Sequence, residues 1–449
     1  MRIIMHKLSI MIIFTVLSLL TFSACVSNST NQDLQNNPQA ETIIEVTIPG
    51  SISLENNIYL EILDEVTGLG LNRIRYQMGI NEQNTYSLIL PLVINSVVKY
   101  RYVRGGNPPL IEYDSQGVQV RYRIYHVKSP SVIHDQIAGW QDSSYEGKTG
   151  TLQGFIYDES SSRPISNVMV IIAGMRTFTG EDGAYTITGI PVGEHRLTAY
   201  HVDCLYQNFQ QDAVIAANAT TPANFGMKSS PLVNITFQVT PPIEHMAGAP
   251  VRLIGNLLST GNTFMDLRGG LNILARNVQN MNFYEDGTYA TTLSIPSGCY
   301  FEYKYSLGDG FWNAEHESNG KWKLRKIIIP SKDMTINDRI DSWKDNDSYP
   351  ITLNITTPSD TPSNGIVAIE FNPFVWMEPI SIWNLGRNQW LYMLYSPLNF
   401  INNASFRVLL NDSSGRKDDI ATQGENPEGI KISPSQTSID YIVNGWVPK

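Results

Sequence analysis

The chain is poor in charged residues and in cysteine. Only 16% of its 449 residues are charged, and it has three cysteines and seven histidines. It contains no Cys-x-x-Cys and no His-Glu-x-x-His pattern, so the sequence predicts neither a structural zinc site nor a zinc hydrolase site. The Gly-x-Ser-x-Gly elbow and the Gly-x-x-x-x-Gly-Lys-Ser/Thr phosphate loop are also missing. We therefore expect no catalytic residue, no metal and no cofactor.

The charge balance also limits the partners. The net charge is −10 and no basic stripe occurs along the chain, so nucleic acid is not an expected partner. Hydrophobic residues make up 42% of the chain, which is a globular composition. A chain of 449 residues is too long for one β-sandwich core and suits three to four domains.

The N-terminus has the pattern of a targeting segment. Arg2 and Lys7 precede an apolar run from Leu8 to Leu20, which is short for a membrane span. The following Phe22-Ser-Ala-Cys25 resembles a bacterial lipobox, although the usual leucine is replaced by Phe22. The resemblance implies a signal peptide over 1–24 and a membrane anchor on Cys25, hence an extracytoplasmic lipoprotein at the bacterial cell surface. An ordinary secretory signal with a chance cysteine is the alternative.

Residues 25–42 are rich in Ser, Asn and Gln and predict a flexible tether. The two remaining cysteines, Cys204 and Cys299, fall in different predicted domains. A disulfide between them would require the two domains to dock, so we expect two separate thiols.

One phrase occurs three times. His134-Asp-Gln-Ile-Ala-Gly-Trp140 returns as Asn337-Asp-Arg-Ile-Asp-Ser-Trp343 and, with one extra residue, as Ile439-Asp-Tyr-Ile-Val-Asn-Gly-Trp446. Each copy closes about 100 residues, as expected for a repeated module. We interpret the phrase as the last strand of a module and predict that all three tryptophans are buried. Residues that do not repeat are the better candidates for function.

Each repeat opens with a strand-like alternation that ends at Pro49, Pro241 or Pro358. Further β-branched and aromatic runs follow, and no long segment has helical periodicity. The sequence predicts an all-β protein of tandem immunoglobulin-like, carbohydrate-binding-like β-sandwiches. The expected bounds are 43–145 for the first repeat, 150–229 for a different β-sandwich, 231–346 for the second repeat and 350–449 for the third.

The segment 150–229 resembles the carboxypeptidase regulatory-like module. The resemblance rests on Arg163-Pro-Ile-Ser-Asn-Val-Met-Val170, Thr179-Gly-Glu-Asp-Gly-Ala-Tyr185 and Gly189-Ile-Pro-Val-Gly193. It implies a small Greek-key sandwich with no catalytic residues, acting as a spacer or a carbohydrate-binding-like accessory. Asp182-Gly183 predicts a hairpin turn with positive φ at the glycine.

The second repeat resembles family-20 starch-binding modules. The matching motifs are Val251-Arg-Leu-Ile-Gly-Asn256, Ile295-Pro-Ser-Gly298 and Phe301-Glu-Tyr-Lys-Tyr305, followed by Trp312. The first tryptophan of that family is missing here, where Phe264 follows, and the residues after Trp312 also depart from the pattern. Both departures place starch itself in doubt, while the implied carbohydrate-binding-like fold stands.

Eight tryptophans occur, and four of them do not repeat. We expect Trp390 to belong to the core together with the three closing tryptophans. The unrepeated ones lie in predicted loops, where binding residues concentrate and where aromatic rings can pack on sugar C–H faces. The candidate carbohydrate-binding residues are Trp312, Trp322, Trp376, Trp383, Asn313 and Glu315, with Asn388 as a further polar partner. The alternative is that each tryptophan packs against its own or a neighbouring domain.

These observations predict a non-catalytic, lipid-anchored and monomeric surface protein that binds a polysaccharide or another glycan. One alternative is the accessory region of a glycoside hydrolase or other secreted hydrolase whose catalytic domain would follow Lys449. A second alternative is a structural stalk or adhesin in which the modules are spacers.

Overall fold

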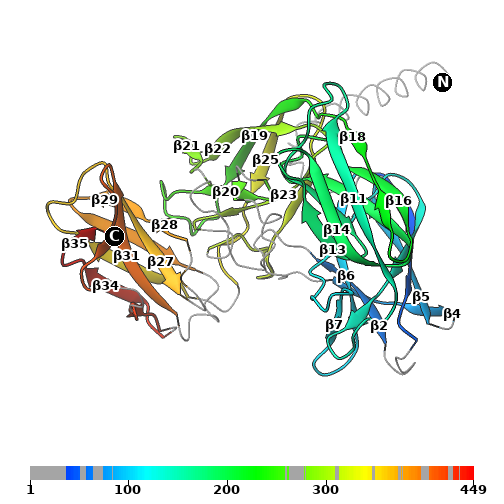
Figure 1. The fold of residues 1–449 in the computed structure, drawn as a ribbon. Helices are drawn as coiled ribbons and strands as arrows, with labels where there is room; N and C mark the ends of the chain where they lie inside the picture. The colour runs from blue at the N-terminus through cyan, green and yellow to red at the C-terminus, as the bar shows by residue number, and fades with distance from the viewer. Residues whose placement is uncertain are drawn as a thin grey trace, which may run out of the picture. The chain divides into compact units, whose positions relative to one another are not determined.

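The structure is a computed structural model, and the regular elements of its described residues are strands that form eight sheets (Figure 1). It describes residues 37–448 except 51–56, 64–73, 83, 258–259, 262–277, 279, 309–312, 346–348, 373–375, 377, 396–403, 423–427 and 434. The all-β prediction is confirmed. No helix of this described part is long and apolar enough to cross a membrane. The predicted signal peptide and Cys25 lie outside the described residues.

The first module contains two sheets. One has the order β4-β5-β1-β9, and the other has the order β10-β7-β6-β2-β3 with β8 paired to β6. The strands are β1 (Gln39–Thr47), β2 (Ile58–Leu63), β3 (Ile74–Gln77), β4 (Gly79–Glu82), β5 (Thr85–Val93), β6 (Val97–Arg104), β7 (Leu110–Tyr113), β8 (Arg123–His126), β9 (Ser131–Gln136) and β10 (Gly139–Trp140).

The second module also has two sheets. They are β14-β11-β17, with β18 also paired to β11, and β13-β12-β15-β16. The strands are β11 (Thr149–Asp158), β12 (Val168–Ile172), β13 (Met175–Phe178), β14 (Ala184–Pro191), β15 (Gly193–His201), β16 (Phe209–Ile215), β17 (Thr220–Pro222) and β18 (Phe225–Met227). Gly183 adopts φ 75° in the turn before β14, as predicted, but the turn is not a hairpin, because β13 and β14 belong to different sheets.

The third module pairs the sheet β21-β22-β19-β25 with the sheet β20-β23-β24. The strands are β19 (Leu232–Thr240), β20 (Arg252–Gly255), β21 (Asn282–Phe283), β22 (Tyr289–Pro296), β23 (Tyr300–Ser306), β24 (Arg325–Ile328) and β25 (Met334–Arg339). Side chains alternate along β19, so that Ile235, Phe237 and Val239 enter the core while Asn234 faces solvent.

The fourth module has the sheets β29-β30-β26-β34 and β28-β27-β31-β32-β35, with β33 paired to β31. The strands are β26 (Ile351–Thr356), β27 (Ile366–Asn372), β28 (Ile380–Ser381), β29 (Trp383–Gly386), β30 (Gln389–Leu394), β31 (Ser405–Asp412), β32 (Gly415–Asp419), β33 (Ile430–Lys431), β34 (Ser438–Ile442) and β35 (Trp446–Pro448).

The three predicted opening strands are β1, β19 and β26, and each ends just before its proline, at Thr47, Thr240 and Thr356. Each of them lies between two neighbours in its sheet. One neighbour is antiparallel, and the other is the parallel strand β9, β25 or β34 from the end of the same module. In the second module β11 pairs in parallel with β17 and β18 in the same way. The chain therefore enters one end of each parallel pair and leaves at the opposite end.

The prediction of two separate thiols is wrong. Cys204 follows β15, Cys299 lies between β22 and β23, and the two form a disulfide with a Cα–Cα separation of 5.5 Å. That separation is within the range that a disulfide spans without moving the backbone. The two cysteines lie in different modules, so their approach depends on the docking of the second module to the third, which the sequence does not indicate. The bond instead closes a covalent loop across 95 positions of sequence.

Removing this cross-link should cost much stability. For a loop of this size the chain-entropy model gives about 4 to 5 kcal/mol at 25 °C. We expect the double substitution Cys204→Ala and Cys299→Ala to lower the free energy of unfolding of the second and third modules by up to that amount in urea denaturation. Reductant should destabilise the native protein and leave the double variant unchanged. Equal stability of the two proteins without reductant would contradict the prediction.

Candidate functional site

The closing tryptophans divide into two kinds. Trp140 and Trp343 are fully buried, as predicted, and Trp390 is also in the core. The prediction is wrong for Trp446, which is only half-buried. Its strand β35 pairs with β32 at the margin of a sheet, and its indole Nε1 donates to Thr361 Oγ1 at 2.9 Å. The ring therefore lies at the rim of the fourth module.

Strand register gives a better alignment of the repeated phrase than its letters do. Asp135 lies opposite Val46, Asp338 lies opposite Val239, and the residue opposite Ile355 is Tyr441. Thus the three copies align without an insertion, and Tyr441 occupies the place of the two aspartates. The expected match of Asp440 to those aspartates is wrong. Asp440 is exposed, and its Oδ1 accepts a hydrogen bond from Asn354 Nδ2 at 2.7 Å.

A buried ion cluster surrounds the aspartate of the third module. Arg325 on β24 donates from Nη1 to Asp338 Oδ1 at 2.7 Å and from Nη2 to Glu315 Oε2 at 2.8 Å. The hydroxyls of Tyr303 and Tyr305 on β23 both donate to Asp338 Oδ2, at 3.0 and 2.8 Å. Asp338 belongs to β25 and Tyr303 to the opposite sheet, so the cluster joins the two sheets of the sandwich.

The first module contains the same cluster. Arg123 on β8 donates from Nη1 to Asp135 Oδ1 at 2.9 Å and from Nη2 to Glu112 Oε2 at 2.8 Å. Tyr100 and Tyr102 donate to Asp135 Oδ2 at 2.8 and 2.7 Å. In both modules the glutamate also accepts the backbone N–H of the second tyrosine, at 2.9 Å here and 3.0 Å in the third module. The same atoms form the same hydrogen bonds in both modules, which indicates that the cluster has a role in the fold.

In the fourth module a single hydrogen bond takes the place of this cluster. Its donor, rather than its acceptor, lies on the strand that corresponds to β9 and β25. Tyr441 on β34 donates its hydroxyl to Asp419 Oδ2, and Asp419 belongs to β32 in the opposite sheet. The positions of the paired tyrosines are taken here by apolar residues of β31 such as Phe406 and Val408. A polar bridge between the last strand and the opposite sheet is thus common to all three repeats.

Burial and charge keep the tyrosines and the arginine of each cluster protonated. Burial and the nearby Asp338 carboxylate raise the pKa of Tyr303 and Tyr305 well above 10, so both phenols remain donors. Burial alone would lower the pKa of the Arg325 guanidinium, but Glu315 and Asp338 outweigh it and raise that pKa. Tyr100, Tyr102 and Arg123 shift in the same directions for the same reasons.

Three of the predicted sugar-binding residues lie in the interior. Glu315 is fully buried and bound to Arg325, so it is a repeated residue, the counterpart of Glu112. Asn313 is fully buried, and its Oδ1 accepts the N–H of Tyr395 at 2.8 Å. Trp383 on β29 is 4% exposed and packs near Tyr392 in the fourth module. None of the three presents its polar or ring atoms to solvent.

The structure does not bring the other candidates together. Trp322 is partly exposed, and its ring lies 4.4 Å from the His316 ring in the third module. Trp376 is half-buried in the fourth module, where the Arg407 guanidinium lies 4.3 Å from its ring centroid. Asn388 is partly exposed in the turn between β29 and β30. Trp312 lies outside the described residues.

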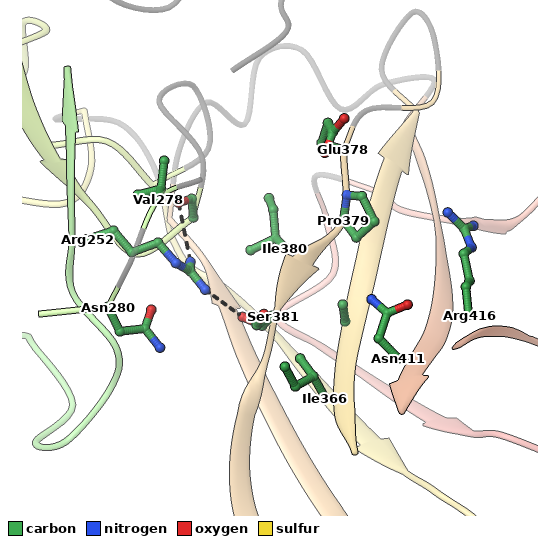
Figure 2. Close-up of a pocket in the computed structure, with 12 residues that line it drawn as sticks. Arg252, Val278, Asn280, Ile366, Glu378, Pro379, Ile380, Ser381, Asn411 and Arg416 are labelled. Carbon is green, nitrogen blue, oxygen red and sulfur yellow. Dashed lines mark hydrogen bonds between the residues drawn. The ribbon is translucent and has the colours of Figure 1, made fainter. Parts of the chain in front are cut away.

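A pocket that the sequence did not point to lies between β20 of the third module and β27, β28 and β32 of the fourth (Figure 2). Its cavity volume is about 520 Å³. Arg252 crosses it and donates from Nη2 to the Ser381 carbonyl at 3.2 Å and from Nη1 to the Leu307 carbonyl at 2.9 Å. Asn280 and Asn411 lie on opposite sides. No sequence motif marks the site, because its residues come from separate strands of two modules.

Metal binding has no support in the described part of the chain. No group of three or more His, Cys, Asp or Glu side chains there could hold an ion.

Breaking one buried cluster should destabilise its module. Glu315→Gln keeps the shape of the side chain but leaves Arg325 with one carboxylate instead of two. We expect the free energy of unfolding of the third module to fall by about 3 to 5 kcal/mol, the usual cost of breaking a buried ion pair. Glu112→Gln should do the same to the first module, and both effects are measurable by calorimetry. The exposed Glu285→Gln is the control, and a change within about 0.5 kcal/mol for Glu315→Gln would refute the structural role.

Comparison with solved structures gives only weak similarity. The Bacillus anthracis TIE protein is 12% identical with a TM-score of 0.18, and the alignment covers 86% of this chain and 67% of that one. A Streptococcal ancillary pilin is 10% identical with a TM-score of 0.24, covering 67% and 99%. The minor pilin GBS52 of Streptococcus agalactiae is 14% identical with a TM-score of 0.17, covering 42% and 97%. Similarity at these TM-scores does not support a conclusion about this chain.

No protein of curated function matches the chain in sequence. One family does match part of it. Residues 151–228 match the family of the carboxypeptidase regulatory-like domain, which confirms the resemblance found in the sequence of the second module.

Proposed function

We propose that this chain is a non-catalytic stalk at the bacterial cell surface whose β-sandwich modules carry tension in series. The proposal rests on the parallel pairing of each opening strand with a strand from the end of the same module. It recurs in all four modules, with registers such as Ile235↔Met334 to Thr240↔Arg339 in the third. The predicted lipid anchor on Cys25 would fix one end of the chain.

Parallel end strands resist a pull on the chain ends. When the first and last strands run the same way, tension slides one strand along the other and loads all the hydrogen bonds between them at once. A force applied to both strands at the same end of the pair would instead break those hydrogen bonds one at a time. Each bond contributes only about 1 kcal/mol in water, so simultaneous loading is what gives such a pair its resistance.

Two further features support the proposal. The polar bridge of each repeat holds the last strand to the opposite sheet, through Asp135, Asp338 or Tyr441. The Cys204–Cys299 disulfide joins the second module to the third by a covalent bond. Both features strengthen the sites where tension would enter a module.

The direction of the pull should decide the unfolding force of the third module. Leu232, Thr240 and Arg339 are exposed, so cysteine handles at these positions should leave the core intact. Pulling between Leu232→Cys and Arg339→Cys loads β19 and β25 in shear. Pulling between Thr240→Cys and Arg339→Cys peels the same strands from one end. We expect a several-fold higher force for the first pair in single-molecule force spectroscopy. Equal forces would rule out a load-bearing strand pair.

Glycan binding is the second candidate function. Trp322 favours it, because this ring keeps part of its surface in solvent beside His316. Partly exposed aromatic rings of this kind pack on the C–H faces of sugars. On this hypothesis the stalk itself would bind a polysaccharide weakly.

Trp322→Ala tests this second function. If the ring binds sugar, the substitution should reduce affinity for a bound polysaccharide about tenfold or more, as measured by isothermal titration calorimetry. Tyr349→Ala, which truncates a side chain that is 81% exposed, should leave the affinity unchanged. Undiminished binding by Trp322→Ala would remove Trp322 from the proposal.

A further inference from the structure

The pocket between the third and fourth modules has the composition of a sugar site. We propose that it binds one or two sugar residues of a polysaccharide chain. This inference is independent of the load-bearing role and of Trp322. It rests on the size of the pocket, on its polar groups and on its apolar wall.

The volume suits a small saccharide. The cavity volume of about 520 Å³ lies within the range of small-molecule sites. Ligand sites also occur preferentially where domains meet. Four of the lining residues, including Arg252 and Asn280, come from the third module, and the remaining eight come from the fourth.

Two amides face the pocket from opposite walls. Asn280 lies beside β20, Asn411 lies on β31, and both side chains are exposed (Figure 2). An amide offers two donors and an acceptor, which matches neighbouring hydroxyls on a sugar ring. Glu378 adds an acceptor at the same opening.

Arg416 adds a hydrogen-bond donor, Nη2, that has no partner among the described residues. Arg416 is held in place by bonds from Nη1 to Glu370 Oε1 at 2.6 Å and from Nε to Asp418 Oδ1 at 2.9 Å. Its Nη2 is buried and has no hydrogen-bond partner among the residues that the structure describes. Arg416 lines the pocket, and its guanidinium adds a positive charge that attracts a hydroxyl or carboxylate oxygen of a ligand.

The apolar wall completes the match to a sugar. Ile366 at the start of β27 is 53% exposed, and it lines the pocket together with Pro379 and Ile380. A sugar ring has C–H groups on one face and hydroxyls at its edge. It can therefore lie against this wall while its hydroxyls reach Asn280 and Asn411.

The test uses matched panels of neutral and uronic-acid oligosaccharides with the purified chain. We expect at least one panel member to bind, and the panels distinguish a hydroxyl from a carboxylate as the partner of Arg416. Asn280→Ala and Asn411→Ala should each weaken that binding about tenfold in isothermal titration calorimetry. Asn337→Ala, which truncates an exposed asparagine on β25, should leave it unchanged.

Two results would overturn the proposal. One is the absence of any dissociation constant below about 1 mM in either panel. The other is a bound sugar whose affinity does not respond to Asn280→Ala or Asn411→Ala. Neither result bears on the force difference that tests the stalk.

Discussion

A buried guanidinium fixes the architecture of the first and third modules. Arg123 and Arg325 each sit between two sheets with two carboxylates and, through the shared aspartate, two tyrosine hydroxyls. A charge in the interior is tolerated only when its hydrogen-bonding groups are matched, so each partner depends on the others. The strand that carries Asp135 or Asp338 must therefore pair in one register for the aspartate to reach the arginine.

This constraint connects the core to the proposed mechanical role. The strand that carries Asp338 is the strand that leaves the module, and it pairs in parallel with the strand that enters. Holding β25 to the opposite sheet holds the parallel pair together as well. In the fourth module one bond from Tyr441 replaces the whole cluster, so its last strand is bound less firmly to the opposite sheet.

Much of the fold could be predicted from the sequence, because period-two alternation and proline positions are local signals. β1, β19 and β26, the turn at Gly183 and the burial of Trp140 and Trp343 all followed from such signals. The disulfide could not be predicted, because it depends on the docking of two modules. The burial of Trp446 was predicted wrongly, because its position matches Trp140 and Trp343 in the phrase while its ring lies at the rim of the fourth module and donates to Thr361.

The residues of the candidate site could be predicted from the sequence only in part, again because their contacts join distant parts of the chain. Glu315 looked unrepeated because its counterpart Glu112 lies on β7, in a segment of different sequence. A spacing of ten residues from Tyr102 and from Tyr305 was the signal that could have paired them. The pocket around Arg252 had no local signal, because its residues are far apart in the chain.

Native-state hydrogen exchange tests the central claim most directly. The amides of Ile137, Ile340 and Val443 occupy the same position, each donating to the threonine that ends the opening strand. If the ion clusters hold the last strands, the amides of Ile137 and Ile340 should exchange only when their modules unfold, and that of Val443 should exchange faster. Equal or slower exchange at Val443 would contradict the claim that the buried arginine clusters anchor these strands.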